Sequence, residues 1–200
     1  MKHAGGVPAE SVERLRTYAA LLLRWNARIN LIGRGSEADV WQRHVLDSAQ
    51  LAPLLPDPPG ALADLGAGAG FPGLVLALTT GWHVHLVESD QRKAAFLREA
   101  VRVTGANAEV HAVRAESLTL PPLPVVAARA LAPLTDLLAL AAPLLAPGGV
   151  CLFLKGRTAE DELTAAAREW HMRVERFPSR TSPEATLLRI SEISRVAPAT

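Results

Sequence analysis

A glycine-rich segment holds the residues whose types and spacing suggest chemistry most directly. Four glycines lie within residues 66–73, directly after the apolar run 61–65. Glycine is needed where φ is positive, or where a ligand approaches the backbone with no Cβ between them. At a strand-to-helix turn this pattern predicts a loop that binds a nucleotide-like ligand through Gly66 and Gly68, with the carboxylate of Asp64 at the mouth of the site. The alternative is a glycine-rich turn without a ligand.

An acidic residue ends the next apolar run, HVHLVE, and narrows the ligand class. The carboxylate of Glu88 can accept hydrogen bonds from both hydroxyls of a ribose, each worth roughly 1.5–3 kcal/mol. Such a contact suits NAD and S-adenosyl-L-methionine equally, and it excludes NADP because a 2′-phosphate would face a like charge. The G-x-G-x-x-G pattern of residues 68–73 alone suggests a dinucleotide, but it is a weak signal. The alternative for Glu88 is a solvated acid at a strand end.

The third apolar run leads to Ala115 and Glu116, and the loop after a third strand borders the adenine edge of such a ligand. A simple charge at a helix start is the alternative interpretation of Glu116. An enzyme of hydride transfer needs a second mononucleotide-binding half and an acid–base residue, and we find neither in the sequence. The chain therefore has the outline of a methyltransferase that uses S-adenosyl-L-methionine.

Strand-like and helical segments alternate from residue 61 to residue 170. The expected strands are residues 61–65, 83–88, 108–113, 124–130 and 149–155, and the expected helices are residues 72–80, 90–104, 133–146 and 159–170. This alternation is typical of βαβ units in a parallel sheet with helices on both faces. Two more strand-like runs, 172–177 and 185–193, have no helix between them, which predicts an antiparallel pair at one edge. The predicted fold is a Rossmann-like α/β fold with a seven-stranded, mostly parallel sheet.

The part of the chain before this sheet is predicted to be helical. We expect residues 1–59 to form an N-terminal helical extension and residues 60–200 to form the Rossmann-like domain. Apolar residues at spacings of three and four predict a first helix over residues 8–30. Ser36, with Asp39 three residues later, is expected to cap a second helix.

Charge and cysteine content exclude several classes of protein. The 200 residues include 21 basic and 20 acidic ones, a net charge of +1, which argues against a histone-like binder with strong non-specific affinity for RNA. Cys151 is the single cysteine, so the chain has neither a disulfide framework nor a multi-cysteine zinc site. Arg24 and Arg28 are four residues apart, and we expect them to share a helix face that contacts RNA phosphates. A solvated helix flank is the alternative.

The distribution of apolar residues predicts a soluble cytoplasmic protein without a membrane segment. The longest uncharged stretch, residues 137–154, is interrupted by Pro143, Pro147 and two glycines, so a helix, a turn and a strand explain it better than a membrane span. The first residues of the chain do not resemble a signal peptide. We expect the protein to be a monomer.

Few side chains are candidates for covalent or acid–base catalysis. Cys151 lies within the apolar run VCLFL, where it is expected to be core, so attack on cytosine through a cysteine nucleophile is excluded. The histidines at 83, 85 and 111 alternate within strands and are interpreted as surface or filler residues. The sequence also shows no obvious Ser-His-Asp or Cys-His constellation. We therefore predict no catalytic side chain and no metal ligand.

Seven blocks of the sequence resemble one family over roughly residues 18–157. These blocks are RWNARINL, QRHVLDS, DLGAGAGFPGLVLAL, VESDQRKAAFL, RAESL, ARALAPL and FLKGR. They resemble the bacterial small-subunit rRNA methyltransferases that act on N7 of a guanine in 16S rRNA, the family also called glucose-inhibited division protein B. The resemblance implies S-adenosyl-L-methionine as cofactor, and 16S rRNA, free or within the small ribosomal subunit, as partner. It implies cofactor contacts at Gly66, Phe71, Ala115, Glu116 and Arg129, and an RNA-facing side with Arg43, His44 and Lys155.

Other interpretations of these residues and of the whole chain stay open. Arg129 can instead lock the turn after its strand by an ion pair, Lys155 can be a lysine that snorkels at a strand end, and His44 a polar surface residue. The chain departs from the family pattern at Ile32, at Pro124 and at the pair 185–186. Methylation of a small molecule or a protein on the same fold is one alternative function. A non-catalytic protein of ribosome assembly that keeps the cofactor pocket is another.

Overall fold

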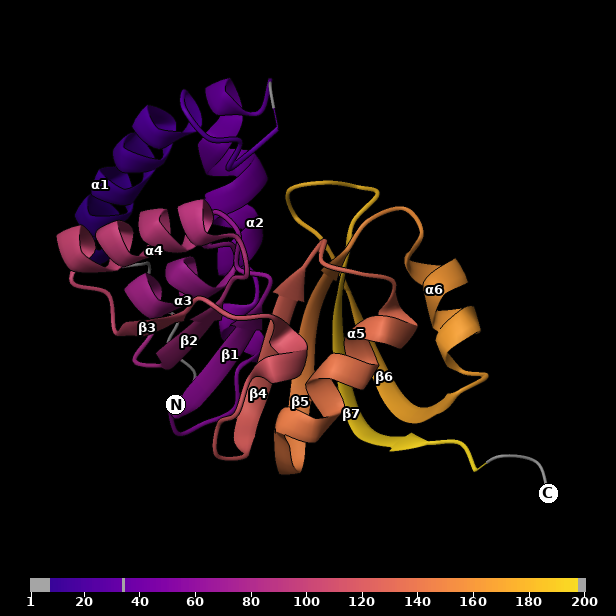
Figure 1. Cartoon of the computed structure of the whole chain (residues 1–200). Coiled ribbons are helices and arrows are strands. Elements are labelled where there is room, and N and C mark those ends of the chain that lie inside the picture. Colours follow the sequence, from indigo (N-terminus) through magenta and orange to yellow (C-terminus); the bar gives the residue numbers. More distant parts are fainter. Residues whose placement is uncertain (1–7, 34, 198–200) are drawn as a thin grey trace.

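A single mixed sheet of seven strands organises the molecule, as the computed structural model shows for residues 8–33 and 35–197 (Figure 1). The strand order is β3-β2-β1-β4-β5-β7-β6. The first five strands pair in parallel, and β7 pairs antiparallel with both β5 and β6. This confirms the predicted sheet and its antiparallel edge pair. The strands are β1 (Ala61–Leu65), β2 (His83–Val87), β3 (Ala108–His111), β4 (Leu123–Arg129), β5 (Leu145–Lys155), β6 (Trp170–Pro178) and β7 (Thr186–Arg195).

Helices pack against both faces of the sheet, one group on each face. One core cluster joins α1, α3 and α4 to strands that include β1 and β2, and a second joins α5 and α6 to strands that include β4, β5 and β7. Figure 1 shows α1, α3 and α4 grouped near β1, β2 and β3, and α5 and α6 beside β4 to β7. The α-helices are α1 (Ala9–Asn26), α2 (Asp47–Ala49), α3 (Gly73–Thr79), α4 (Gln91–Thr104), α5 (Leu134–Ala141) and α6 (Ala159–Ala166). The 3₁₀-helices are η1 (Glu37–Asp39), η3 (Ala52–Leu54), η4 (Ala115–Ser117) and η5 (Ala142–Leu144), and η2 (Trp41–Leu46) is a π-helix.

The first helix ends earlier than its apolar periodicity predicts. It stops at Asn26 rather than at residue 30, because the buried side chain of Asn26 turns the chain back on itself. Its Oδ1 accepts the backbone N–H groups of Leu31 and Ile32, each at 2.9 Å. Arg28 therefore lies in the turn after α1, and the prediction that Arg24 and Arg28 share a helix face is wrong.

The predicted second helix is also wrong, because the segment is broken into short turns of different pitch. The Ser36 hydroxyl donates to the carbonyl of Gly33 and makes no capping bond to η1. The chain then passes through η1, η2, α2 and η3. Single π-helical turns are frequent at functional sites, and η2 holds Arg43 and His44.

Candidate functional site

The glycine-rich loop joins the carboxyl end of β1 to α3, and its backbone requires glycine. Gly66 has φ +68° and Gly68 has φ +56°, a conformation that side chains with a Cβ rarely adopt. A Cβ on Gly66 would lie 2.5 Å from Leu131 Cδ1, so this glycine also permits close packing against the loop after β4. A Cβ on Gly68 would meet no atom nearer than the carbonyl oxygen of Gly66 at 3.7 Å. The loop is therefore closed on one side and open on the other.

The open side of the loop faces a cavity of about 300 Å³ at the carboxyl ends of the parallel strands. Ligands of open α/β folds bind at this edge of the sheet. Glu88, at the end of β2, accepts the backbone N–H of Gly68 at 2.9 Å and that of Asp90 at 2.8 Å. The cavity is lined by Gly66, Gly68, Val87, Glu88, Ser89, Lys93, Val113, Arg114, Ala115, Glu116, Ala130, Leu131 and Leu140. The predicted cofactor residues that border this cavity together with Glu88 are therefore Gly66, Gly68, Ala115 and Glu116.

Asp64 lies beneath the loop, so the prediction that its carboxylate reaches the mouth of the site is corrected. Its side chain is fully buried, and Oδ2 accepts the backbone N–H of Gly73 at 2.8 Å. Oδ1 has no hydrogen-bond partner among the described residues. Burial raises the pKa of Asp64 to about 7, although the Gly73 bond and the charge of Arg129 oppose this shift. Its position one residue before the end of β1 points it into the core under the start of α3.

On the other side of the loop, four side chains form a cluster that we call the Arg129 cluster: Phe71, Arg129, His44 and Asp47. The guanidinium of Arg129 lies over the ring of Phe71, 4.8 Å from its centroid, and the ring of His44 stacks on Phe71 at 5.1 Å. Arg129 Nη1 lies 3.1 Å from His44 Nδ1 and 3.6 Å from Asp47 Oδ2. Arg129 therefore makes an ion pair, but with Asp47 of the N-terminal segment rather than within the turn after β4, and this pair joins β4 to that segment.

Electrostatics keep the histidine of this cluster neutral. Burial and the positive charges of Arg129 and Arg43 lower the pKa of His44 to about 4. A ring without a charge can stand beside the Arg129 guanidinium without repulsion. His44 Nε2 also lies 3.0 Å from the hydroxyl of Ser36, so the ring is held from both edges.

Lys155 is buried at the end of β5, so its predicted contact with RNA gains no support from its position. Only 6% of the residue is exposed, and Nζ donates to the carbonyl of Ala132 and to Glu162 Oε2, both at 2.7 Å. Burial alone would raise the pKa of Glu162, but hydrogen bonds from Lys155 and Thr158 outweigh it and lower that pKa overall. The pair fixes α6 against the loop after β4.

The other residues predicted to contact RNA are on the surface. Arg24, Arg28 and Arg43 are all exposed, and the segment with Arg43 is held by the loop between β6 and β7. In that loop, the hydroxyl of Thr181 donates to Asp47 Oδ1 at 2.6 Å. Gln50 Oε1 accepts the backbone N–H of Arg180. The C-terminal hairpin therefore supports the N-terminal segment beside the Arg129 cluster, a contact that links distant parts of the sequence.

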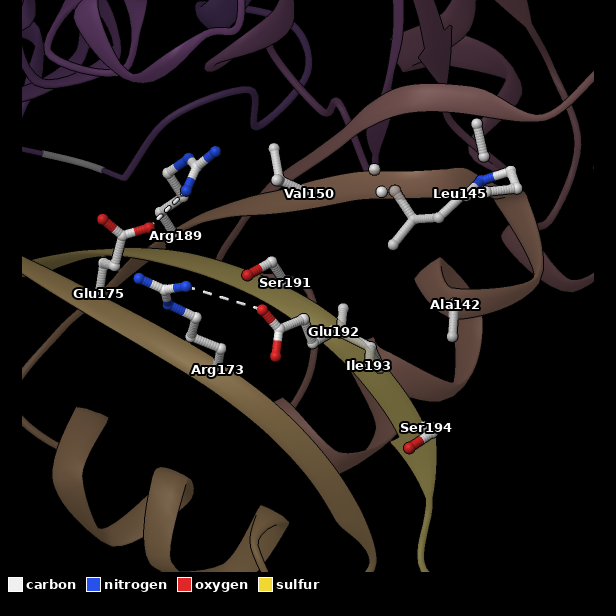
Figure 2. A pocket seen from close by; sticks show the side chains of 14 residues that line it. Ala142, Leu145, Val150, Arg173, Glu175, Arg189, Ser191, Glu192, Ile193 and Ser194 are labelled. Carbon is white, nitrogen blue, oxygen red and sulfur yellow. Dashed lines mark hydrogen bonds and ion pairs between the residues drawn. The ribbon is translucent and has the colours of Figure 1, made fainter.

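A larger cavity of about 880 Å³ lies at the opposite end of the sheet, around the amino end of β5 (Figure 2). Its charged side chains are already paired with each other: Arg189 with Glu175, and Arg173 with Glu192 at 3.7 Å. It is away from the carboxyl ends of the parallel strands, where ligands bind in this fold. Size alone therefore does not mark the site, and the smaller cavity beside the glycine loop is the better candidate.

Comparison with known proteins places the chain in a family. The family model GidB, described as rRNA small subunit methyltransferase G, matches residues 11–186. The chain belongs to this family. A relative named Ribosomal RNA small subunit methyltransferase G from Rhodospirillum centenum is 61% identical over 96% of this chain and 88% of the relative. One of the same name from Granulibacter bethesdensis is 58% identical over 96% of this chain and 90% of the relative. The family predicted from the sequence blocks is confirmed.

Solved structures of more distant proteins confirm the class of fold. TYW2 of M. jannaschii in complex with AdoMet has a TM-score of 0.60 at 14% identity, covering 85% of this chain and 80% of that one. The N-methyltransferase NodS of Bradyrhizobium japonicum in complex with S-adenosyl-L-homocysteine has a TM-score of 0.56 at 15% identity, covering 89% of this chain and 97% of that one. The Rossmann-like class I methyltransferase fold is therefore shown for this member of the GidB family. Among the described residues, no helix is long and apolar enough to cross a membrane.

Three residues of the site were not predicted as such. Asp47 lies within the block QRHVLDS, so its place in a family motif was the available signal. Tyr18 has no sequence signal beyond the apolar spacing of α1, yet its buried hydroxyl donates to the carbonyl of Ala69 in the glycine loop. Glu162 had no signal, because its role depends on Lys155 reaching it from another element. Of the departures from the family pattern, Ile32 is a buried core residue, Pro124 lies in β4, and Thr186 begins β7 beside Lys155.

Proposed function

We propose that this protein transfers a methyl group from S-adenosyl-L-methionine to N7 of a guanine in 16S rRNA. The observation that supports this most is the cavity at the carboxyl edge of the sheet, bordered by the glycine loop and by Glu88, in a chain of the GidB family. The relatives are named for methylation of small-subunit rRNA. The structural neighbours of the same fold are described with AdoMet or S-adenosyl-L-homocysteine.

The residues around the cavity fit this cofactor. Each oxygen of Glu88 accepts one backbone N–H and keeps a lone pair for a ribose hydroxyl. The position where a Cβ of Gly68 would stand is free of close protein atoms, so a ligand can approach the backbone there. Ala115 and Glu116 of η4 border the same cavity and would face the adenine. When bound, S-adenosyl-L-methionine supplies an electrophilic methyl group on its sulfonium.

Methylation at guanine N7 does not require a general base from the protein. N7 has an in-plane lone pair and no proton, so the protein has to align the base and exclude water rather than remove a proton. His44 is partly exposed and stacks on the buried ring of Phe71, so its outer ring face is the one available to a base, and the pKa of about 4 keeps it uncharged at neutral pH. Asp47 offers a carboxylate near the positive charge that the methylated base acquires. We propose that the Arg129 cluster positions the guanine.

The exposed arginines of the N-terminal segment suit the RNA backbone. Arg24, Arg28 and Arg43 are exposed, and arginine makes bidentate contacts with phosphate. We therefore place the RNA over this segment, beside the Arg129 cluster. Lys155 acts in this proposal through the support that it gives to the loop after β4, since its ammonium is already bonded to Ala132 and Glu162.

A transfer assay with tritiated S-adenosyl-L-methionine tests the proposal. Purified protein is incubated with free 16S rRNA, with small subunits, and with a transcript in which guanosine is replaced by 7-deazaguanosine. Label in the RNA or in the subunits, and none in the 7-deaza transcript, is the expected result, because the deaza base has carbon at the acceptor position. Equal labelling of the 7-deaza transcript would show another acceptor atom. Label only in proteins or small molecules, or cofactor binding without any transfer, would favour one of the two alternative functions.

A further inference from the structure

Three histidines and a glutamate gather on one face of the outer strands, apart from the cavity described above. His83 and His85 lie on β2, and Glu109 and His111 lie on β3. The parallel register sets His85 beside Glu109, and the two strands present alternate residues to each face. Because Val84 and Leu86 of β2 belong to the core under α1, α3 and α4, His83 and His85 point to the opposite face.

That face receives little cover at this edge of the sheet. The segment from β3 to β4 contains only the short η4 as helix, whereas α5 and α6 pack toward β4 to β7 (Figure 1). The side chain of His85 is 12% exposed, that of His111 is 18% exposed, and that of Glu109 is 61% exposed. The cluster is therefore half-buried, with the carboxylate at its solvent side, and an ion can reach it.

The ligand atoms lie close to the spacing that a single ion needs. One ligand atom from each of His83, His85 and Glu109 lies within 4.8 Å of the others. His85 Nδ1 is 3.0 Å from His111 Nε2, and each of these atoms is 3.9 Å from an oxygen of Glu109. Ligand atoms of a tetrahedral zinc site stand about 3.3 Å apart, as follows from Zn–N distances of about 2.0–2.1 Å. The His85–His111 pair already has about this spacing, whereas the carboxylate of Glu109 has to move closer to the imidazoles when an ion binds.

An imidazole binds a metal through a nitrogen with a free lone pair, and binding releases any proton held there. His85 Nδ1 and His111 Nε2 lie within hydrogen-bond distance, so the proton that they share would pass to solvent when both bind the ion. His83 Nδ1 lies 2.9 Å from Asn107 Oδ1, so Nδ1 holds the proton and Nε2 is the free ligand.

We propose that His83, His85 and Glu109, with His111 as the fourth ligand, bind one divalent transition metal ion of the zinc and nickel class. Imidazole nitrogens with one carboxylate select these ions over magnesium and calcium, which prefer oxygen ligands. The ion would link the two outermost parallel strands. This site differs from the sequence prediction that these histidines are surface or filler residues and that the chain has no metal ligand, and it does not depend on methyl transfer.

Titration of the full-length, chelator-treated protein with zinc chloride tests this inference. The expected result is one saturable zinc ion per chain in the wild type and in His171→Gln, the control, since His171 is an exposed histidine on the distant strand β6. In His85→Gln and in Glu109→Gln the affinity is expected to fall by more than about tenfold, because each variant removes a ligand. Glu109→Gln changes an exposed side chain, so it reports on the site even if His85→Gln does not fold.

Two further measurements separate a built site from weak surface binding. Cobalt chloride in place of zinc should give visible absorption bands in the wild type and in His171→Gln, and these bands should be lost in His111→Gln. At the same zinc concentration, the Tm of the wild type should rise more than that of Glu109→Gln. Absence of saturable binding, or equal zinc affinity in the wild type, His85→Gln and Glu109→Gln, overturns the proposal.

Discussion

Replacement of Glu88 by alanine probes the structural basis of cofactor binding most directly. The two carboxylate oxygens of Glu88 hold the backbone N–H groups of Gly68 and Asp90, at 2.9 and 2.8 Å. The same oxygens are the proposed acceptors for two ribose hydroxyls. Glu88→Ala removes the four lone pairs of the two oxygens and leaves the N–H of Gly68 without its acceptor. The variant therefore loses both the bond that shapes the loop and the proposed hydrogen bonds to the ribose.

The magnitude follows from the hydrogen bonds. Loss of the two bonds to the ribose, partly offset by water that takes the place of the removed carboxylate, should weaken binding by roughly 2–4 kcal/mol. This corresponds to a Kd that rises roughly 30- to 800-fold. The lost bonds to the backbone act on the free protein instead, and they should lower the free energy of unfolding by about 2 kcal/mol. The two effects are therefore measured separately, the first by binding and the second by denaturation.

Calorimetric titration with S-adenosyl-L-homocysteine measures the first effect, and urea unfolding without ligand measures the second. Glu13→Ala is the control, because Glu13 is an acidic side chain of α1 that is 71% exposed and remote from the cavity. A Kd of Glu88→Ala within threefold of the wild-type value, in protein that remains folded, would refute the assignment of the ribose to Glu88. A lowered stability with unchanged Kd would show that Glu88 only shapes the loop.

Three further predictions concern buried polar groups. Burial raises the pKa of Asp64 from 3.8 to about 7, so its contribution to stability is complete below pH 4 and is lost as the pH rises to 7. The free energy of unfolding of the wild type, relative to that of Asp64→Asn, should therefore fall by up to about 4 kcal/mol over this range. Urea titrations at several pH values that give a constant difference would contradict this. Lys155→Met leaves the carboxylate of Glu162 without its partner and should cost about 2–3 kcal/mol of stability at pH 7, which Lys155→Met/Glu162→Gln should partly restore. Full stability of the single variant would show that this pair does not fix α6, and a loss of RNA methylation in such a stable variant would then favour the predicted contact with RNA. Tyr18→Phe removes the hydroxyl that donates to the carbonyl of Ala69. It should lower the free energy of unfolding by about 1–2 kcal/mol, measured by thermal unfolding, and weaken binding of S-adenosyl-L-homocysteine severalfold. An unchanged Tm and Kd would show that this bond does not hold the loop.

The elements of the sheet could be predicted because their signals are local. The runs 61–65 and 83–88 agree with β1 and β2 to within a residue, since buried parallel strands are short apolar segments between turn residues. The glycines of the loop could be predicted for the same reason, because positive φ values at Gly66 and Gly68 are a property of the local backbone.

The features that sequence alone could not predict depend on partners far along the chain. The end of α1 is set by the side chain of Asn26, which captures two backbone groups of the following turn. The burial of Lys155 depends on Glu162 of α6, and the segment with Asp47 is held by Thr181 of the C-terminal hairpin. Periodicity cannot show these contacts, since each joins side chains that only the tertiary fold brings together.

The bond from Tyr18 to Ala69 has a consequence for protein engineering. Helix α1 provides the donor for a carbonyl inside the glycine loop, and Gly70 leaves just enough room for the phenol, since a Cβ there would stand 3.1 Å from its oxygen. A glycine loop combined with a first helix that lacks this tyrosine would therefore leave the carbonyl of Ala69 unpaired in an apolar interior. Chimeras within the family should exchange α1 and the loop as a matched unit.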